Sequence, residues 1–284
     1  MSVAVSGTFL AAYDEVLARW PAGTTTSTLA TAHGTTHLIS HGPESAPPVL
    51  LLPGGGATAT GWYATAAALG RTHRVHAVDL IGEPGRSVPE DADPIRTAGD
   101  LTAWFGSLLD ALGLRSAGLV GHSYGAWIAL RYALKDPARV DRLVLLDPTN
   151  CFTGFSPRYL LRALPMLLRP TPARNAAFLR WETGGAELDP RWRHLNALAA
   201  DFPTVRPVTG PRPTRAELST LKPPTLLLLA EHSRAHGIAK AAARARAAVP
   251  AMETATVPGA THHVLPVGSP PETYDRIAGF LTSE

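Results

Sequence analysis

The sequence predicts an α/β fold with a mostly parallel central sheet, helices on both faces and a helical cap insertion. Apolar runs of strand length alternate with helical stretches along the chain, which is typical of a parallel sheet. Runs such as VLLL (49–52) and LLLLA (226–230) are apolar at every position, as expected for strands buried on both faces. The alternation is lost between Pro148 and Leu221, where nine prolines occur.

The individual elements follow from periodicity and from the residues that break it. A helix over Thr8–Trp20 ends at Pro21, and the alternating segment THLIS (36–40) is expected to be a strand. The strand VLLLP (49–53) stops at three consecutive glycines, Gly54 to Gly56. Further strands are expected at 74–80, 117–123, 142–147, 225–231 and 252–257, and further helices at 62–69, 97–112, 124–136 and 272–281.

The segment without strand rhythm is expected to be a cap. It contains helical pieces at 159–168, 174–181 and 191–200 and no clear strand. We therefore expect residues 148–220 to form a helical insertion over one end of the sheet. Residues 1–147 and 221–284 would then form the core domain.

Composition excludes several classes of protein. The 284 residues are 45% hydrophobic and carry a net charge of +3, which suits a folded core and not a disordered chain. The single cysteine, Cys151, excludes a disulfide scaffold and a four-cysteine zinc site, and a buried inert thiol is expected there. The longest apolar runs are too short for a membrane span. The N-terminus lacks the basic start of a signal peptide, so a cytoplasmic location is expected.

The basic charge is concentrated in one segment. All but three of the 26 basic residues are arginines. The segment between Thr149 and Thr220 contains ten arginines and only five acidic residues. No basic run is interleaved with aromatic residues, so nucleic acid is not an expected partner. The arginines are expected to form a solvated surface, with attraction of anionic substrates as the alternative.

The pentapeptide Gly121-His122-Ser123-Tyr124-Gly125 carries the strongest chemical signal. It follows an apolar strand and opens a helix, and G-x-S-x-G in that context is the nucleophile elbow. The turn is so tight that side chains two residues before and after the serine would collide, which requires glycine. The serine then lies at a helix N-terminus, whose dipole favours developing negative charge. We expect Ser123 to be a nucleophile and His122 a packed neighbour.

Six motifs, in their order and spacing, resemble those of the α/β-hydrolase family, and within it the capped serine carboxylesterases. They are LLPGGGATATGWY, RVHAVDLIGEPGRS, GLVGHSYG, RVDRLVLLDP, PTLLLLAEH and VPGATHH. The resemblance covers the chain from about Thr36 to Leu281 and departs at Pro53, where the family often has histidine. It implies an enzyme that needs no cofactor, and nothing in the sequence suggests a metal, nucleotide or flavin.

The same resemblance implies the oxyanion hole and the general base. The backbone N–H groups of Gly55 and Tyr124 would hold the oxyanion, although the PGGG segment could also be merely a flexible loop. The pattern VPGATHH places the base at His262, with Thr261 where glycine is common in the family. His263 is the alternative base.

The acid departs from the family pattern. Its usual site, after the TLLLLAEH strand, is occupied by Ser233, which cannot carry charge. Asp147 ends the neighbouring strand RLVLLD, and some family members place their acid there. We favour Asp147, with Glu231 and a site without an acid as the alternatives.

The expected function is therefore ester hydrolysis of a small-molecule acyl substrate through an acyl-enzyme on Ser123. A thioesterase, acyltransferase or cyclase of a biosynthetic pathway is a second interpretation. A third comes from another class: a binding protein that kept the fold and lost efficient catalysis, which Ser233 suggests. Membrane partners are not expected.

Overall fold

The computed structural model describes residues 6–203 and 207–283. The ends of the expected domain ranges at 1–5 and 284, and the cap residues 204–206, lie outside this description. The described part contains one sheet in the strand order β1-β2-β4-β3-β6-β7-β8-β9, with β5 paired to β2. The strands are β1 (Thr25–Thr31), β2 (Gly34–His41), β3 (Pro48–Leu52), β4 (Arg74–Val78), β5 (Val88–Pro89), β6 (Ala117–His122), β7 (Val140–Leu146), β8 (Thr225–Ala230) and β9 (Glu253–Val257).

The sheet is mostly parallel, as the continuous apolar runs predict. Strands β4, β3, β6, β7, β8 and β9 pair in parallel, whereas β1, β2 and β5 form an antiparallel edge. Alternate residues of each central strand pack into different cores: Leu119 and Leu143 lie in one, Val120 and Val144 in the other. Burial on both faces explains why these strands are apolar at every position.

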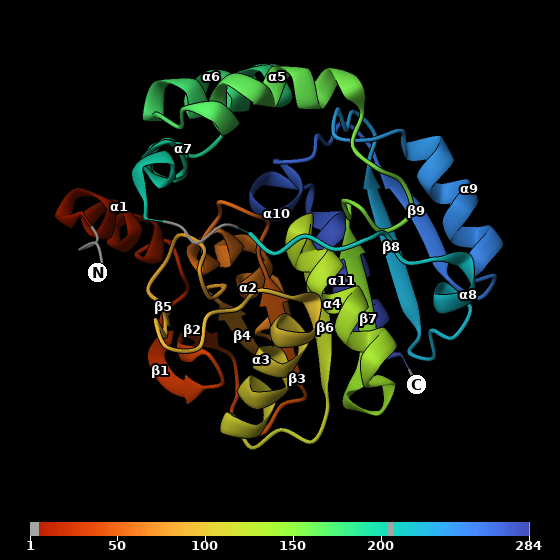
Figure 1. Cartoon of the computed structure of the whole chain (residues 1–284). Helices are drawn as coiled ribbons and strands as arrows, with labels where there is room; N and C mark the ends of the chain where they lie inside the picture. Colours follow the sequence, from red (N-terminus) through yellow and green to blue (C-terminus); the bar gives the residue numbers. More distant parts are fainter. Residues whose placement is uncertain (1–5, 204–206, 284) are drawn as a thin grey trace.

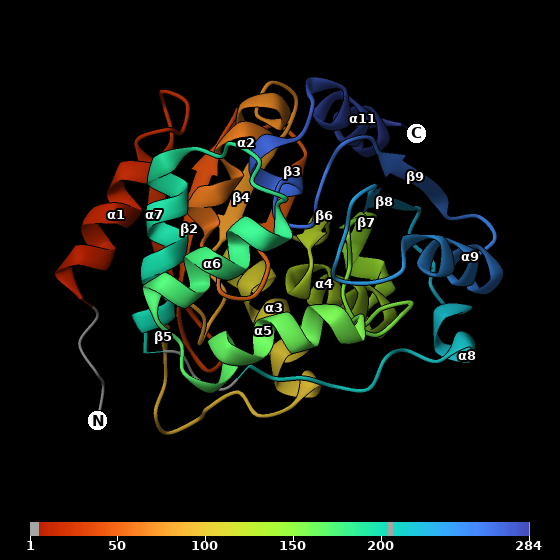
Figure 2. The same cartoon turned by 90° about the horizontal axis from the view of Figure 1, so that it is seen from above.

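Helices cover both faces of the sheet (Figures 1 and 2). One core contains side chains of α3 (Ala98–Ala111), α4 (Tyr124–Lys135) and α9 (Ile238–Ala248). The other contains side chains of α1 (Gly7–Leu17), α2 (Tyr63–Leu69) and α11 (Pro271–Thr282). A short 3-10 helix, η1 (Ala59–Trp62), precedes α2, and α10 (Leu265–Gly268) precedes α11. Another 3-10 turn, η2 (Pro137–Arg139), links α4 to β7.

The prolines that break the strand rhythm begin the helices of the insertion. Helices α5 (Pro157–Leu168), α6 (Pro172–Glu182) and α7 (Pro190–Leu198) each start with proline, whose fixed φ suits the first helical turn. The preceding residues Ser156, Thr171 and Asp189 accept backbone N–H bonds as N-caps, which stabilises each helix by about 1 kcal/mol.

The three insertion helices lie above the sheet in Figure 1, and α7 packs against α1. The 3-10 turn η3 (Ala199–Asp201) follows α7. The short helix α8 (Arg215–Leu218) lies elsewhere, beside α9, although it falls inside the expected insertion. No strand occurs in the described residues between 148 and 221.

Two strands and one long helix are absent from the sequence prediction. Strand β1 is rich in threonine and largely exposed at the sheet edge, so it lacks an apolar signature. Strand β5 has only two residues. Helix α9 buries only alanines, Ala241, Ala245 and Ala248, and such small side chains give a weak hydrophobic period.

Candidate active site

Ser123 stands on a strained turn between β6 and α4. Its φ is 52°, which is unusual for a residue other than glycine. A Cβ on Gly121 would lie 2.6 Å from the Ala126 backbone, and one on Gly125 would overlap the carbonyl oxygens of Leu52 and Pro53. The two glycines therefore allow the turn to form, for the steric reason expected from the sequence.

A continuous hydrogen-bonded chain links Ser123, His262 and Asp147. His262 Nε2 lies 2.9 Å from Ser123 Oγ, and His262 Nδ1 lies 2.6 Å from Asp147 Oδ2. The three residues follow β6, β9 and β7, so they meet at the carboxyl end of the parallel strands. With its hydrogen on Nδ1, the imidazole leaves Nε2 free to accept the Ser123 proton.

Asp147 is fully buried, and four polar groups lie close to its carboxylate. Its Oδ2 accepts a hydrogen bond from the Ser233 hydroxyl at 2.6 Å, in addition to the one from His262. Its Oδ1 accepts the Ala230 N–H at 3.2 Å and lies 3.2 Å from Nε2 of the buried His236. Burial by itself would raise the pKa of the Asp147 carboxyl, but its contacts with His236 and His262 outweigh burial and hold the pKa far below its usual range. The carboxylate is therefore charged at neutral pH.

Glu231, the alternative acid, takes part in a different contact. Its Oε2 accepts the Gly259 N–H at 2.8 Å, and nearly half of the side chain is exposed. This hydrogen bond ties the start of the loop after β8 to the loop after β9. Asp147, and not Glu231, is the carboxylate in contact with the His262 ring.

Two further histidines, His122 and the alternative base His263, lie beside His262. The carbonyl of His262 accepts a hydrogen bond from His122 Nε2 at 2.8 Å, which places the hydrogen of His122 on that nitrogen. Burial, together with His262 and His263, lowers the pKa of His122 well below its usual value, so it remains a neutral neighbour of the elbow. His263 Nδ1 lies 2.9 Å from Oε2 of Glu182, a residue of the insertion.

The two expected oxyanion donors belong to adjacent segments. Tyr124 is the first residue of α4, where a backbone N–H has no partner within the helix. A Cβ on Gly55 would lie 3.7 Å from Tyr124 Cβ, so the glycine loop passes close to the elbow. The next residue of that loop, Gly56, donates its N–H to Glu83 at 2.8 Å. Burial raises the pKa of Glu83 to about 7, although the Gly56 hydrogen bond opposes the shift.

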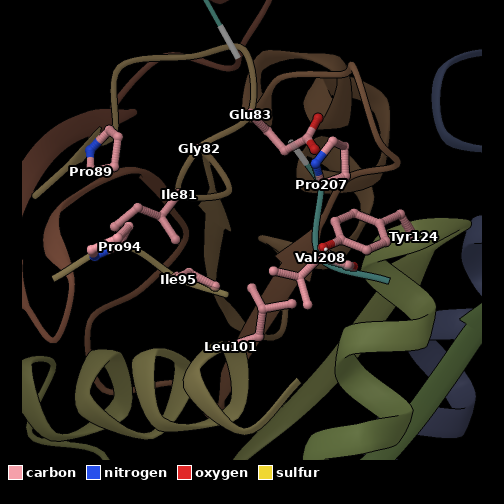
Figure 3. Close-up of a pocket in the computed structure, with 10 residues that line it drawn as sticks. All are labelled: Ile81, Gly82, Glu83, Pro89, Pro94, Ile95, Leu101, Tyr124, Pro207 and Val208. Atoms are coloured by element: carbon pink, nitrogen blue, oxygen red, sulfur yellow. Dashed lines mark hydrogen bonds between the residues drawn. The ribbon is translucent and has the colours of Figure 1, made fainter. Parts of the chain in front are cut away.

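A small cavity lies beside Tyr124 (Figure 3). Ile81, Glu83, Leu101 and Val208 contribute to its lining, and the Tyr124 hydroxyl donates to the Val208 carbonyl at 2.9 Å. Its volume of about 30 Å³ is enough for a water molecule or two.

Several contacts of the site lie beyond the sequence prediction. Ser233 is expected only as a missing acid, yet its hydroxyl donates to the acid on the neighbouring strand. His236, three residues later, has both ring nitrogens buried. Glu182 is fully buried although it ends a helix, where the dipole disfavours a negative charge. An acid at a helix C-terminus is the one signal in the sequence that could have marked it.

Cys151 is buried, which raises the pKa of its thiol, in agreement with an inert role.

Within 6–203 and 207–283, no group of three or more histidine, cysteine or acidic side chains could hold a metal ion. No helix in the same part of the chain is long and apolar enough to cross a membrane.

The fold agrees with comparisons to known proteins. A model of the alpha/beta hydrolase family matches residues 49–276, and the chain belongs to this family. It is 32% identical to carboxylesterase YbfK of Bacillus subtilis, over 96% of this chain and 93% of that protein. The crystal structure of that carboxylesterase, also called CesB, superimposes with a TM-score of 0.90 over 97% of both chains at 29% identity. The structure of naproxen esterase from the same organism gives a TM-score of 0.90 at 28% identity, over 98% of this chain and 99% of that one.

Proposed function

We propose that the protein is a carboxylic ester hydrolase that acts through an acyl-enzyme on Ser123. The observation that carries the proposal is the hydrogen-bonded chain from Ser123 Oγ through His262 to Asp147. The similarity to two Bacillus carboxylesterases over nearly the whole chain supports the same activity.

In the proposed first step, His262 Nε2 takes the hydroxyl proton as Ser123 Oγ attacks the acyl carbonyl. The N–H groups of Tyr124 and Gly55 stabilise the resulting oxyanion, and removal of one such donor in other enzymes costs about 10²–10³ in rate. His262 then gives its proton to the leaving alcohol, and the acyl group remains on Ser123 as an ester. Asp147 keeps the imidazole in the Nδ1–H tautomer and stabilises its cationic form.

In the second step, water replaces the alcohol. The water oxygen attacks the acyl-enzyme while His262 accepts a proton from the water. His262 then returns this proton to Ser123 as the carboxylic acid leaves. The two steps use the same groups in reverse order, which is typical of serine hydrolases.

The insertion helices α5, α6 and α7 act in this proposal as a cap. Tyr159 on α5 supports that role, since its ring lies edge-on to the His262 ring with the centroids 6.4 Å apart. The binding-protein alternative was suggested by Ser233, which stands where the family usually has its acid. Ser233 instead donates a hydrogen bond to Asp147, so its presence no longer argues against catalysis.

The test combines covalent labelling with hydrolysis of short p-nitrophenyl esters. A fluorophosphonate should label the wild-type protein once, at Ser123, and abolish hydrolysis in proportion to labelling. An unlabelled, folded protein would refute the proposal, and so would a labelled protein that still hydrolyses the ester.

A further inference from the structure

Glu182 is a buried carboxylate at the junction of the insertion and the core. It is the last residue of α6, and its side chain has no exposed surface. A buried carboxylate costs several kcal/mol in lost solvation unless hydrogen bonds and opposite charges replace the water. The partners of Glu182 therefore indicate what it does.

Within the described part of the chain, the hydrogen-bond partners of the Glu182 carboxylate all belong to the loop that carries His262. Its Oε1 accepts the backbone N–H of His262 at 3.0 Å. Its Oε2 accepts the backbone N–H of His263 at 3.2 Å and the Thr261 hydroxyl at 3.3 Å, and lies 2.9 Å from His263 Nδ1. One carboxylate thus gathers four donors from three consecutive residues.

The charge of Glu182 matches these donors. Burial by itself would raise the pKa of its carboxyl, but the close contact with His263 and the hydrogen bonds from that residue outweigh burial and lower the pKa. The group is therefore ionised at neutral pH, and charged acceptors make stronger hydrogen bonds than neutral ones.

Aromatic side chains surround the same junction. The Phe178 ring on α6 lies edge-on to His263, with the centroids 6.1 Å apart, and Tyr159 on α5 lies edge-on to His262. The next aromatic residue of α6, Trp181, lies beneath the guanidinium of Arg234, which follows β8. Helices α5 and α6 are therefore packed onto the histidine loop, with Glu182 as the polar contact.

We propose that Glu182 is a positioning residue, which fixes the histidine loop so that His262 Nε2 meets Ser123 Oγ. The proposal rests on the function proposed above, in which His262 is the base. The hydrogen bond to the His262 N–H fixes the backbone of that residue, and Asp147 fixes its ring. Alignment of the base thus depends on docking of the insertion, and a loop displaced by about 1 Å can cost about 10²-fold in rate.

The variant Glu182→Gln tests the proposal with little change in size. Either orientation of the amide points its NH2 group at N–H donors, because both carboxylate oxygens accept such donors in the wild type. We expect kcat on a p-nitrophenyl ester to fall about 10–100-fold while KM changes less than about threefold. The control is Glu187→Gln, an exposed residue of the same insertion, for which both constants should remain unchanged.

Fluorophosphonate titration separates positioning from mere stability. A misaligned base should give slow labelling that still reaches one label per chain, and kcat divided by the titrated number of active sites should be low. A merely structural role would give less than one label per chain and a normal kcat per titrated active site, and this result would overturn the proposal. If Glu182→Gln does not fold, Glu182→Asp provides the same test, because it keeps the charge and withdraws the carboxylate by one methylene.

The experiment also distinguishes this proposal from the one on which it rests. If Ser123→Ala abolishes hydrolysis and both Glu182 variants turn over at the wild-type rate, the positioning role is wrong and the serine mechanism stands. If Ser123→Ala keeps its activity, the serine mechanism fails first.

Discussion

Replacement of Asp147 by asparagine should inactivate the enzyme without unfolding it. The surroundings of the carboxylate determine which way the new amide turns. The Ala230 N–H donates to Oδ1, so the amide oxygen of asparagine is held at that position, and its NH2 group then takes the position of Oδ2. There it faces His262 Nδ1 and the Ser233 hydroxyl.

This orientation forces His262 into the wrong tautomer. The ring must accept a hydrogen bond at Nδ1 and therefore carries its hydrogen on Nε2, which can no longer accept the proton of Ser123. The hydroxyl of Ser233 can rotate and adapt, so the fold loses little. The same change in a serine protease costs about 10⁴ in turnover, which corresponds to about 5 kcal/mol of transition-state stabilisation.

The assay is kcat/KM for short p-nitrophenyl esters, with the unfolding midpoint measured in parallel. We expect a loss of about 10⁴-fold for Asp147→Asn and less than about threefold for Glu231→Gln, because Glu231 contacts Gly259 and not the His262 ring. A loss below tenfold in a folded Asp147→Asn variant would refute the reasoning, and inactivity of Glu231→Gln would transfer the role to that residue.

Three further predictions concern the nucleophile, the elbow and a buried acid. Ser123→Ala should lower kcat at least about 10⁴-fold with an unchanged circular dichroism spectrum; wild-type turnover in a pure, folded sample would contradict it. Gly125→Ala should destabilise the fold by more than about 3 kcal/mol, since its Cβ meets backbone carbonyls, whereas Gly279→Ala, with open space inside α11, should leave the urea midpoint equal or higher. The pKa of Glu83 is about 7 in the folded protein and near 4.5 when unfolded, so this group costs stability as pH rises from about 4.5 to 7. Glu83→Gln should therefore be more stable than the wild type at pH 8, by up to about 3 kcal/mol, and about equal at pH 4; a difference independent of pH would exclude this explanation.

The strands and the elbow could be predicted because their signals are local. A strand buried on both faces must be apolar at every position, so runs such as Leu226–Leu229 identify the sheet without reference to any partner. The glycines around Ser123 follow from the tight turn itself. The threonine-rich edge strand and the alanine-rich helix α9 escaped prediction, because neither contributes large apolar side chains to the core.

The order of residues along the chain left the partner of His262 open: Asp147, Glu231 or no acid at all. Asp147 and Glu231 end adjacent strands, β7 and β8, and either could lie near a histidine that follows β9. The tertiary structure decides between them by direction: the Asp147 side chain points toward the His262 ring, and Glu231 points toward Gly259.

The sequence alone determined the central strands, the elbow and the residue types available for catalysis, because each depends on neighbours within a few positions. Only the tertiary structure decided which polar groups meet. Ser233 donates to an acid 86 residues away, and Glu182 accepts from a loop 80 residues away. Such contacts form when the insertion and the strand ends pack together, and the groups must then pair because burial removes the water that would otherwise solvate them.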